Sequence, residues 1–325
     1  MSSPARLAVI LGPTASGKSA LAIALAEKLN GEVVVCDSTQ VYRRFNIGTA
    51  KVPTAAQKGI PHWMMDLVEP HEIFTAGDYR RRAEEILRGI HARERLPIVT
   101  AGTGLYLRAL LEGLADAPTR SEELRARLRE RSAGRGPEYL HRLLRRLDPS
   151  SAARIAPRDT QKIIRAIEMR VLAKKSVNEI HAAGRAPLEG FAPIKIGLKP
   201  PRPALYARIE QRVEEMLAAG WQDEIREILS SGVPSDAKPF TFIGYREILA
   251  QAPVGEGLQT LPKFGPSLPT STINEIRKST RHFAKRQQTW FARETNVHWL
   301  PNFGDDPAAL QRSLQILAQA QSATP

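Results

Sequence analysis

Cysteine is almost absent from this chain, which has one, Cys36, among 325 residues. A single thiol excludes an intramolecular disulfide and a cluster of cysteine ligands around zinc. The seven histidines are scattered, and none stands at a metal-ligand spacing from another. We therefore expect a protein whose chemistry depends neither on thiols nor on a metal held by histidine and cysteine.

Long hydrophobic runs are also missing. No apolar stretch approaches the roughly 20 residues that a membrane span requires. A glycine-rich motif begins so near the start of the sequence that little room is left for a targeting peptide. We expect a cytoplasmic protein without a membrane partner.

Positive charge, in contrast, is abundant. The chain has 47 Lys and Arg against 34 Asp and Glu, a net charge of +13, and its 42% hydrophobic content is sufficient for one large or two medium domains. This excess favours a polyanionic partner, above all nucleic acid, although a basic balance can also be an ordinary solvated surface.

The stretch LGPTASGKS, residues 11–19, matches the phosphate-loop pattern G-x-x-x-x-G-K-[ST]. An apolar run precedes it and a helical run follows, so the backbone N–H groups of the turn and the helix N-terminus are expected to face an anion. The lysine would contact the outer phosphate, and Ser19 is the predicted ligand of Mg²⁺. The predicted phosphate-binding residues are Gly12, Pro13, Thr14, Ala15, Ser16, Gly17, Lys18 and Ser19.

Strand and helix patterns alternate from residue 6 to about 117, which predicts a P-loop NTPase-like, doubly wound α/β sheet with parallel strands. Ligands of such sheets collect beyond the carboxyl ends of the strands. Asp37 follows the second strand and Thr103 follows the third, so both are expected beside the phosphate loop. Asp37 could act through Mg²⁺ or as a base, or it could merely cap a turn; the TAGTGLY turn at 100–106 could also be an ordinary strand-to-helix connection.

Helical, arginine-rich periodicity replaces the strand patterns between residues 118 and 192. We predict a core domain formed by residues 1–117 and 193–325, interrupted by an all-helical insertion domain at 118–192. The second part of the core has strand patterns at 194–199 and 297–300, helical patterns at 202–220 and 270–294, a turn-rich loop at 251–270 and a closing helix.

Two basic regions accompany this core. Arg277, Arg281 and Lys285 recur every four residues, so they share a helix face and repel one another unless a polyanion neutralises them. Trp290 and Phe291 are expected in the core rather than as base-stacking platforms. The insertion has its own arginines, which could contact RNA phosphates or form a plain charged surface. They are Arg120, Arg125, Arg127, Arg129, Arg131, Arg142, Arg145 and Arg146.

Together these motifs resemble one family, the tRNA dimethylallyltransferases, also called tRNA isopentenyltransferases, in their bacterial form. The resemblance extends over about residues 7 to 300. It rests on GPTASGKS, DSTQVY, FNIGTAK, PHWMMD, AGTGLYLRALLEGL, RDTQKIIRAIE, RIEQRV, IGYRE and AKRQQTWF, which occur in that order.

The resemblance implies transfer of a dimethylallyl group from dimethylallyl diphosphate, with Mg²⁺, to the exocyclic amine of the adenine 3′ of the anticodon. The tRNAs would be those that read codons beginning with U. The catalytic residues would be Asp37 as general base, with Thr103 and Arg212 on the diphosphate. The insertion would clamp the anticodon stem-loop, and we expect a monomer. The predicted tRNA contacts are Asp37, Ser38, Thr39, Gln40, Thr103, Arg125, Gln161, Lys162, Ile163, Ile164 and Arg165, with Arg281, Lys285 and Arg286 from the basic helix.

Three other functions remain open at this point. An adenylate isopentenyltransferase would prenylate free AMP or ATP, but it needs neither the insertion nor the basic helix. A nucleotide kinase would use the phosphate loop for ATP. An RNA-binding protein gated by nucleotide would leave Asp37, Thr103 and Arg212 without a common task.

Overall fold

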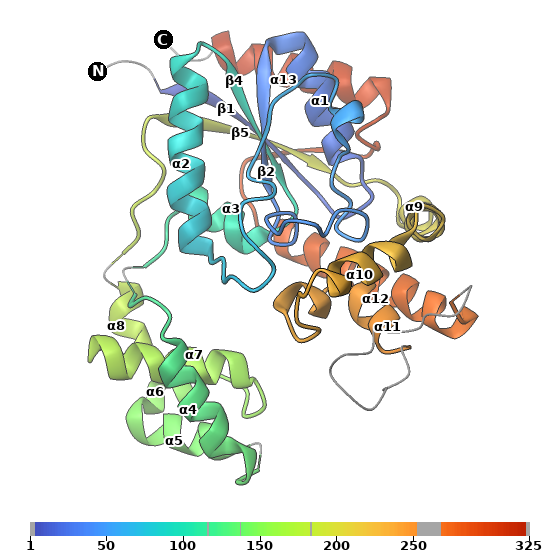
Figure 1. Cartoon of the computed structure of the whole chain (residues 1–325). Helices are drawn as coiled ribbons and strands as arrows, with labels where there is room; N and C mark the ends of the chain where they lie inside the picture. Colours follow the sequence, from blue (N-terminus) through green and yellow to red (C-terminus); the bar gives the residue numbers. More distant parts are fainter. Residues whose placement is uncertain (1–3, 116, 137, 183, 252–267, 323–325) are drawn as a thin grey trace. The chain divides into compact units, whose positions relative to one another are not determined.

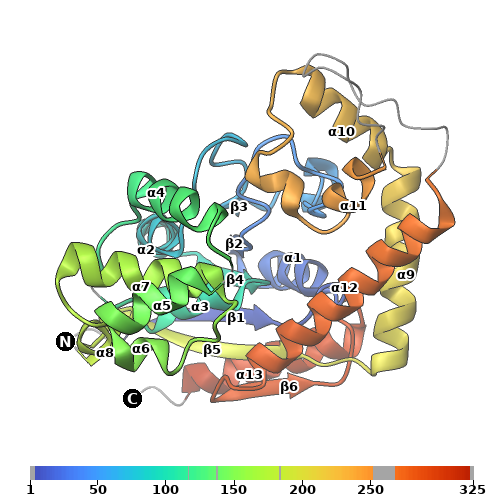
Figure 2. The ribbon, with the colours of Figure 1, turned by 90° about the horizontal axis from the view of Figure 1, so that it is seen from below.

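One sheet of six parallel strands forms the centre of the computed structural model, in the order β3-β2-β4-β1-β5-β6 (Figures 1 and 2). The predicted doubly wound α/β class is therefore confirmed. The two-residue strand β3 was not predicted, because it is too short to carry a hydrophobic pattern. The strands are β1 (Ala5–Leu11), β2 (Gly31–Cys36), β3 (His62–Trp63), β4 (Leu96–Ala101), β5 (Phe191–Leu198) and β6 (Val297–Leu300).

Helices cover both faces of this sheet (Figure 1). Leu7, Val9 and Leu11 of β1 face one hydrophobic cluster, whereas Ala8 and Ile10 face the other. Because both faces are buried there, the central strands β1, β2 and β4 are largely apolar runs rather than alternating ones. Helices α2 (Ala76–Ala92) and α3 (Gly104–Leu111) cover the first face, and α1 (Lys18–Leu29) and α13 (Pro307–Ser322) cover the second.

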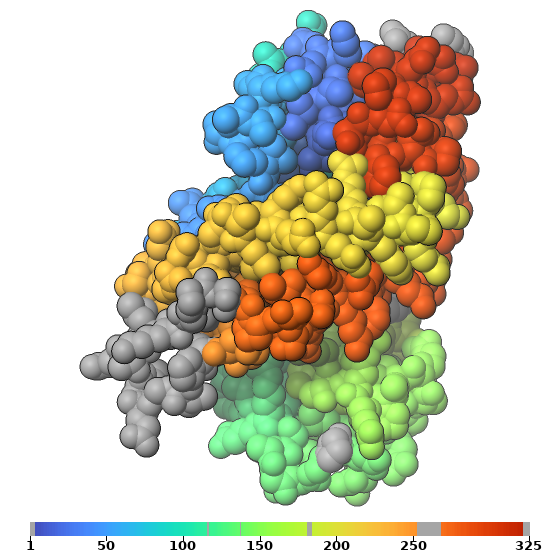
Figure 3. All heavy atoms as spheres, turned by 90° about the vertical axis from the view of Figure 1, so that its right-hand side faces the viewer, coloured from blue at the N-terminus to red at the C-terminus, as the bar shows by residue number. Residues whose placement is uncertain are grey.

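Four more helices lie between β5 and β6 in the sequence. They are α9 (Arg202–Ala218), α10 (Trp221–Ser230), α11 (Tyr245–Leu249) and α12 (Thr270–Phe291), with the 3₁₀ turns η1 (Thr54–Gln57) and η2 (Lys238–Thr241) elsewhere in the same unit. Helix α12 packs along α9, and Figure 3 shows the two as adjoining orange and yellow bands. None of the helices in the described ranges is long and apolar enough to cross a membrane.

The chain divides into two units, and the structure describes residues 4–115, 117–136, 138–182, 184–251 and 268–322. The sheet unit comprises Met1–Leu111 and Leu188–Pro325, and the helical unit comprises Glu112–Pro187. The helical unit thus begins and ends a few residues before the predicted insertion at 118–192. The reason is that Leu188 N donates to Leu111 O at 3.0 Å, so the chain has already returned to the sheet unit at Leu188. Of the predicted loop at 251–270, residues 252–267 lie outside the described ranges.

The helical unit has its own hydrophobic core, which includes Leu128, Leu144 and Ile167. Its all-helical character agrees with the prediction. The helices are α4 (Glu122–Ala133), α5 (Tyr139–Leu147), α6 (Pro149–Ala152), α7 (Thr160–Ala173) and α8 (Val177–Ala182).

Candidate active site

A cavity of about 1660 Å³ opens at the carboxyl edge of the sheet. Its walls come from the phosphate loop, the ends of β2 and β4, the chain between β2 and β3, and the helices α9 and α12. This is the position at which open parallel sheets bind their ligands. The volume exceeds that of a typical small-molecule pocket, so the cavity has room for more than one reacting group.

The phosphate loop forms the turn between β1 and α1. Gly17 caps α1 with a φ of 87°, and a Cβ at this residue would lie 2.6 Å from Gly304 N, so only glycine fits here. Gly304 N also donates to Ser16 O at 2.9 Å, which ties the loop to the segment after β6. The predicted residues that line the cavity are Thr14, Ala15, Gly17, Lys18 and Ser19, whereas Gly12, Pro13 and Ser16 do not line it.

Two cations reach the cavity from different elements. Lys18 Nζ donates to Pro13 O at 2.8 Å, and Arg212 of α9 donates from Nη1 to Thr14 Oγ1 at 3.4 Å. Burial lowers the pKa of Lys18 to about 8; the Asp37 carboxylate opposes this shift and the Arg212 guanidinium adds to it. Burial also lowers the pKa of Arg212. In the described ranges neither cation forms an ion pair, so an anion that enters the cavity meets two unneutralised charges.

Asp37 stands directly after β2, as predicted. Its Oδ1 accepts from Thr39 N at 2.8 Å and from Thr39 Oγ1 at 2.7 Å, so the capping role considered for this carboxylate is present. In the described structure Oδ2 carries no hydrogen bond. The turn therefore occupies one carboxylate oxygen and leaves the other available in a cavity that Asp37 lines.

Thr103 joins the end of β4 to the end of β2. Its N–H donates to Cys36 O at 3.0 Å, and its Oγ1 accepts from Ser38 N at 2.9 Å. The predicted convergence of Asp37 and Thr103 is thereby confirmed. Thr103 and Ser38 do not line the cavity themselves, however, whereas their neighbours do. The neighbours that line it are Thr39, Gln40, Thr100 and Gly102.

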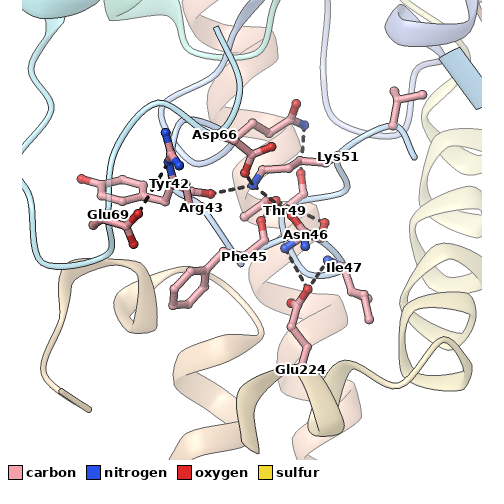
Figure 4. Close-up of polar contacts among 12 residues, drawn as sticks. Tyr42, Arg43, Phe45, Asn46, Ile47, Thr49, Lys51, Asp66, Glu69 and Glu224 are labelled. Atoms are coloured by element: carbon pink, nitrogen blue, oxygen red, sulfur yellow. Dashed lines mark hydrogen bonds and ion pairs between the residues drawn. The ribbon is translucent and has the colours of Figure 1, made fainter. Parts of the chain in front are cut away.

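The FNIGTAK segment, residues 45–51, forms another wall and is held from several sides (Figure 4). The Lys51 side chain is 6% exposed, and its ammonium donates to Tyr42 O at 2.5 Å and pairs with Asp66 at 2.6 Å. Glu224 of α10 accepts from the backbone N–H groups of Asn46 and Ile47, both at 2.8 Å. These contacts hold the segment in place although it has no regular secondary structure.

Gln40 belongs to the same framework, because its Nε2 donates to Thr49 O at 2.9 Å and to Ala50 O at 3.3 Å. Its side chain, predicted to contact tRNA, thus also supports the FNIGTAK segment. Tyr245 donates to Glu224 at 2.5 Å, and burial together with this carboxylate raises the pKa of the phenol.

The basic face of α12 differs from its prediction. Arg277 pairs with Glu214 and Arg281 pairs with Glu210, each at 2.6 Å, so carboxylates of α9 neutralise two members of the stripe. No outside polyanion is needed to balance them in this structure, and the contact of Arg281 with tRNA stays a prediction. The sequence showed no acid within the stripe, but it could not show that a second helix brings one.

Lys285 and Arg286 are exposed and have no ion pair in the part of the chain that the structure describes. Arg286 also lines the cavity. Phe291 is buried as expected, whereas Trp290 is 36% exposed and has the Arg108 guanidinium 5.5 Å from its ring centroid.

Three predicted tRNA contacts of the helical unit need correction. Ile163 and Ile164 are 0% and 2% exposed, because their side chains form the core of the unit. Arg125 is 5% exposed and pairs with Glu168 at 2.8 Å. Gln161, Lys162 and Arg165 are accessible to different degrees. Lys162 pairs with Asp159 and Arg165 pairs with Glu168, and the contacts of all three residues with tRNA stay predictions.

Sequence reasoning missed Gln287, Glu224 and Lys51 as parts of the site. Gln287 is a buried polar residue of α12 that accepts from Thr14 N and donates to Gly102 O, both at 2.7 Å. A signal existed, since Gln287 stands three residues after Ala284 and four before Phe291, in line with an apolar stripe. Glu224 had no comparable signal, because its partners are backbone groups distant in sequence.

Comparisons with known proteins agree with this geometry. A family model described as IPP transferase matches residues 40–294. The tRNA dimethylallyltransferase of Koribacter versatilis is 46% identical over 315 residues, which are 96% of this chain and 97% of that relative.

Solved structures are similar over nearly the whole chain. A tRNA isopentenylpyrophosphate transferase from Bacillus halodurans has a TM-score of 0.67 at 32% identity, with 98% of this chain and 96% of that one covered. A eukaryotic dimethylallyltransferase, crystallised acting on tRNA, has a TM-score of 0.79 at 26% identity, with 99% and 80% covered. By its matched residues, its fold and its relatives, this chain belongs to the IPP transferase family.

Proposed function

We propose that this chain transfers a dimethylallyl group from dimethylallyl diphosphate to the exocyclic amine of an adenine in tRNA and releases diphosphate. The adenine is the one 3′ of the anticodon, in tRNAs that read codons beginning with U. The observation that carries the proposal is one cavity that holds two unneutralised cations, Lys18 and Arg212, together with the Asp37 carboxylate. The names of the relatives support the same activity.

The cations suit the leaving group of this reaction. When the bond between the allylic carbon and the diphosphate oxygen breaks, negative charge develops on oxygen and positive charge on carbon. Lys18, Arg212 and the N-terminus of α1 would stabilise the departing diphosphate. Apolar side chains in the same cavity, including Ile209, Val213 and Met216, suit the hydrocarbon part of the donor.

Asp37 is the proposed general base, which accepts a proton from the adenine amine. The amine nitrogen of adenine forms the new C–N bond, and one of its protons passes to Asp37 Oδ2, the oxygen that the Thr39 turn leaves available. The adenine must leave its stack to enter the cavity, which is the usual requirement for chemistry on a base.

Mg²⁺ is the proposed cofactor. Ser19 lines the same cavity and offers through its hydroxyl the kind of oxygen ligand that this hard cation prefers. It would hold the ion together with water and diphosphate oxygens, and the ion would supply further neutralisation of the leaving group.

Lys285 and Arg286 of α12, with Gln161, Lys162 and Arg165 of the helical unit, are the proposed contacts to the tRNA backbone. The helical unit would grip the anticodon stem-loop. We further propose that the enzyme works as a cytoplasmic monomer.

The decisive assay uses radiolabelled dimethylallyl diphosphate and Mg²⁺ with unmodified tRNA whose anticodon ends in A, and with AMP in parallel. We expect label in tRNA and none in AMP, and almost none in tRNA with the Asp37→Ala variant. Label in AMP alone would identify a free-nucleotide prenyltransferase. ATP hydrolysis or phosphoryl transfer without any label would instead assign the phosphate loop to ATP.

A further inference from the structure

We propose that Gln287 is a positioning residue that holds both turns of the donor site in their binding geometry. Its Oε1 accepts from Thr14 N of the phosphate loop at 2.7 Å, and its Nε2 donates to Gly102 O of the β4–α3 turn at 2.7 Å. One side chain from α12 thereby bridges two turns that the proposed function places around the diphosphate and the base.

Both hydrogen bonds are made at the wall of the cavity by a side chain that is almost completely buried. Gln287 is 6% exposed, and it follows the fully buried Ala284 on the inner side of α12. A buried amide would be unfavourable at this place unless its donor and its acceptor were both satisfied. Two short bonds to two separate turns satisfy both ends of the amide, so this side chain does more than fill space.

Each turn has a direct connection to the reacting groups. Thr14 receives the Arg212 guanidinium on its hydroxyl, and its backbone N–H is already occupied by Gln287. Gly102 N donates to Cys36 O, directly before Asp37. A shift of Gln287 would therefore displace Arg212 relative to Asp37, although Gln287 itself touches neither.

A second contact of α12 supports the same role. A Cβ on Gly104 would lie 2.1 Å from the Trp290 ring, so the helix rests directly on the β4–α3 turn. Lys285 and Arg286, proposed for tRNA, adjoin Gln287 in sequence. The helix that would bind the acceptor thus also fixes the donor turns.

The inference rests on the proposed function, and the test separates the two. The variant is Gln287→Met, which has similar volume but makes neither hydrogen bond, and the control is Gln288→Met on the same helix. We expect the KM for dimethylallyl diphosphate to rise about tenfold or more and kcat to fall, while the KM for tRNA stays unchanged. The control should behave as the wild type does.

Several results would overturn the inference. One is a Gln287→Met enzyme with the kinetic constants of the control. Another is a variant with fewer active molecules but unchanged constants per active site, which would mean that Gln287 only supports the fold. The affinity of the free protein for inorganic diphosphate is measured alongside, so an absence of tRNA labelling by the wild type would refute the function without removing this readout.

Two measurements apply even if Gln287→Met fails to fold. In Gln287→Glu the carboxylate keeps an acceptor for Thr14 N, and only its protonated form can donate to Gly102 O. The affinity of this variant for dimethylallyl diphosphate should therefore approach that of the wild type as the pH falls. In the wild type without ligand, the Thr14 amide should exchange slowly with solvent by NMR, and rapid exchange would contradict the bond to Gln287.

Discussion

The sheet unit and the helical unit handle desolvated charge in opposite ways. In the cavity of the sheet unit, burial lowers the pKa of Lys18 to about 8, and no carboxylate in the described ranges pairs with it. In the helical unit, Glu168 is fully buried and accepts from Arg125, Arg165 and Ser121 N. Burial alone would raise the pKa of Glu168, but these hydrogen bonds lower it to about 2.

The difference separates a binding site from an internal support. A cation that has no paired carboxylate in a cavity is stabilised when an anion binds beside it. A buried carboxylate whose hydrogen bonds come from the protein itself supports the fold instead of binding a ligand. Both units contain arginines that look alike in the sequence, and only the partner of each one reveals its role.

The largest expected effect comes from Asp37, whose carboxylate acts on both cavity cations. Asp37→Asn keeps an oxygen for the Thr39 turn but removes the base, so kcat should fall by about 10² to 10⁴. The affinity for diphosphate should be equal or higher, because a negative charge is removed. Label transfer and diphosphate titration measure these two quantities, with Asp236→Asn at an exposed site as control. An unchanged kcat would refute Asp37 as the base.

The same substitution, arginine to methionine, made once in each unit tests the comparison itself. Arg125→Met removes one of the two arginines that pair with the buried Glu168 and leaves Arg165 as the other. It should lower the free energy of unfolding by about 3 kcal/mol. Arg212→Met should leave stability unchanged or higher, since it removes an unpaired desolvated cation. The affinity for diphosphate should fall in Arg212→Met and stay unchanged in Arg125→Met. Denaturant unfolding and titration report both, and equal destabilisation by the two variants would end the contrast.

The pH dependence of donor binding sharpens the assignment of Lys18. Its pKa of about 8 in the free protein lies below the ordinary value of 10.5. A bound anion favours the charged ammonium, so the bound-state pKa is higher and binding takes up a proton at alkaline pH. The Kd of dimethylallyl diphosphate should thus be flat below pH 8 and rise up to about tenfold per pH unit above it.

Titration of the donor from about pH 7 to about pH 9.5, without tRNA, measures this slope. Lys18→Met is the matched variant and should bind weakly at every pH without the rise. A wild-type Kd that stays flat through the alkaline range would contradict the desolvated state of Lys18.

The smallest effect concerns the stripe of α12. Arg286→Gln should weaken tRNA binding modestly and reduce the slope of log K against log salt by about one. Arg277→Gln should change that slope little, because its partner in the structure is Glu214. Filter binding at several salt concentrations compares the two. Equal slope changes would mean that tRNA displaces Glu214.

The sequence by itself determined the sheet, the phosphate loop and the family. Continuous apolar strands, glycines at fixed spacing and ordered motifs are local properties, and parallel strands must bring their carboxyl ends to one edge. The meeting of Asp37 with Thr103 followed from that rule alone. The same local logic missed β3, because two residues make no pattern.

Only the tertiary structure decided which charges are free and what holds the turns. The sequence does not show that Arg281 and Arg125 have Glu210 and Glu168 as their partners, because these carboxylates come from other helices. Gln287 became visible only when α12 met the phosphate loop. The physical reason is that the free energy of a charged or polar group depends on its neighbours in space, and those neighbours lie dozens to hundreds of residues away along this chain.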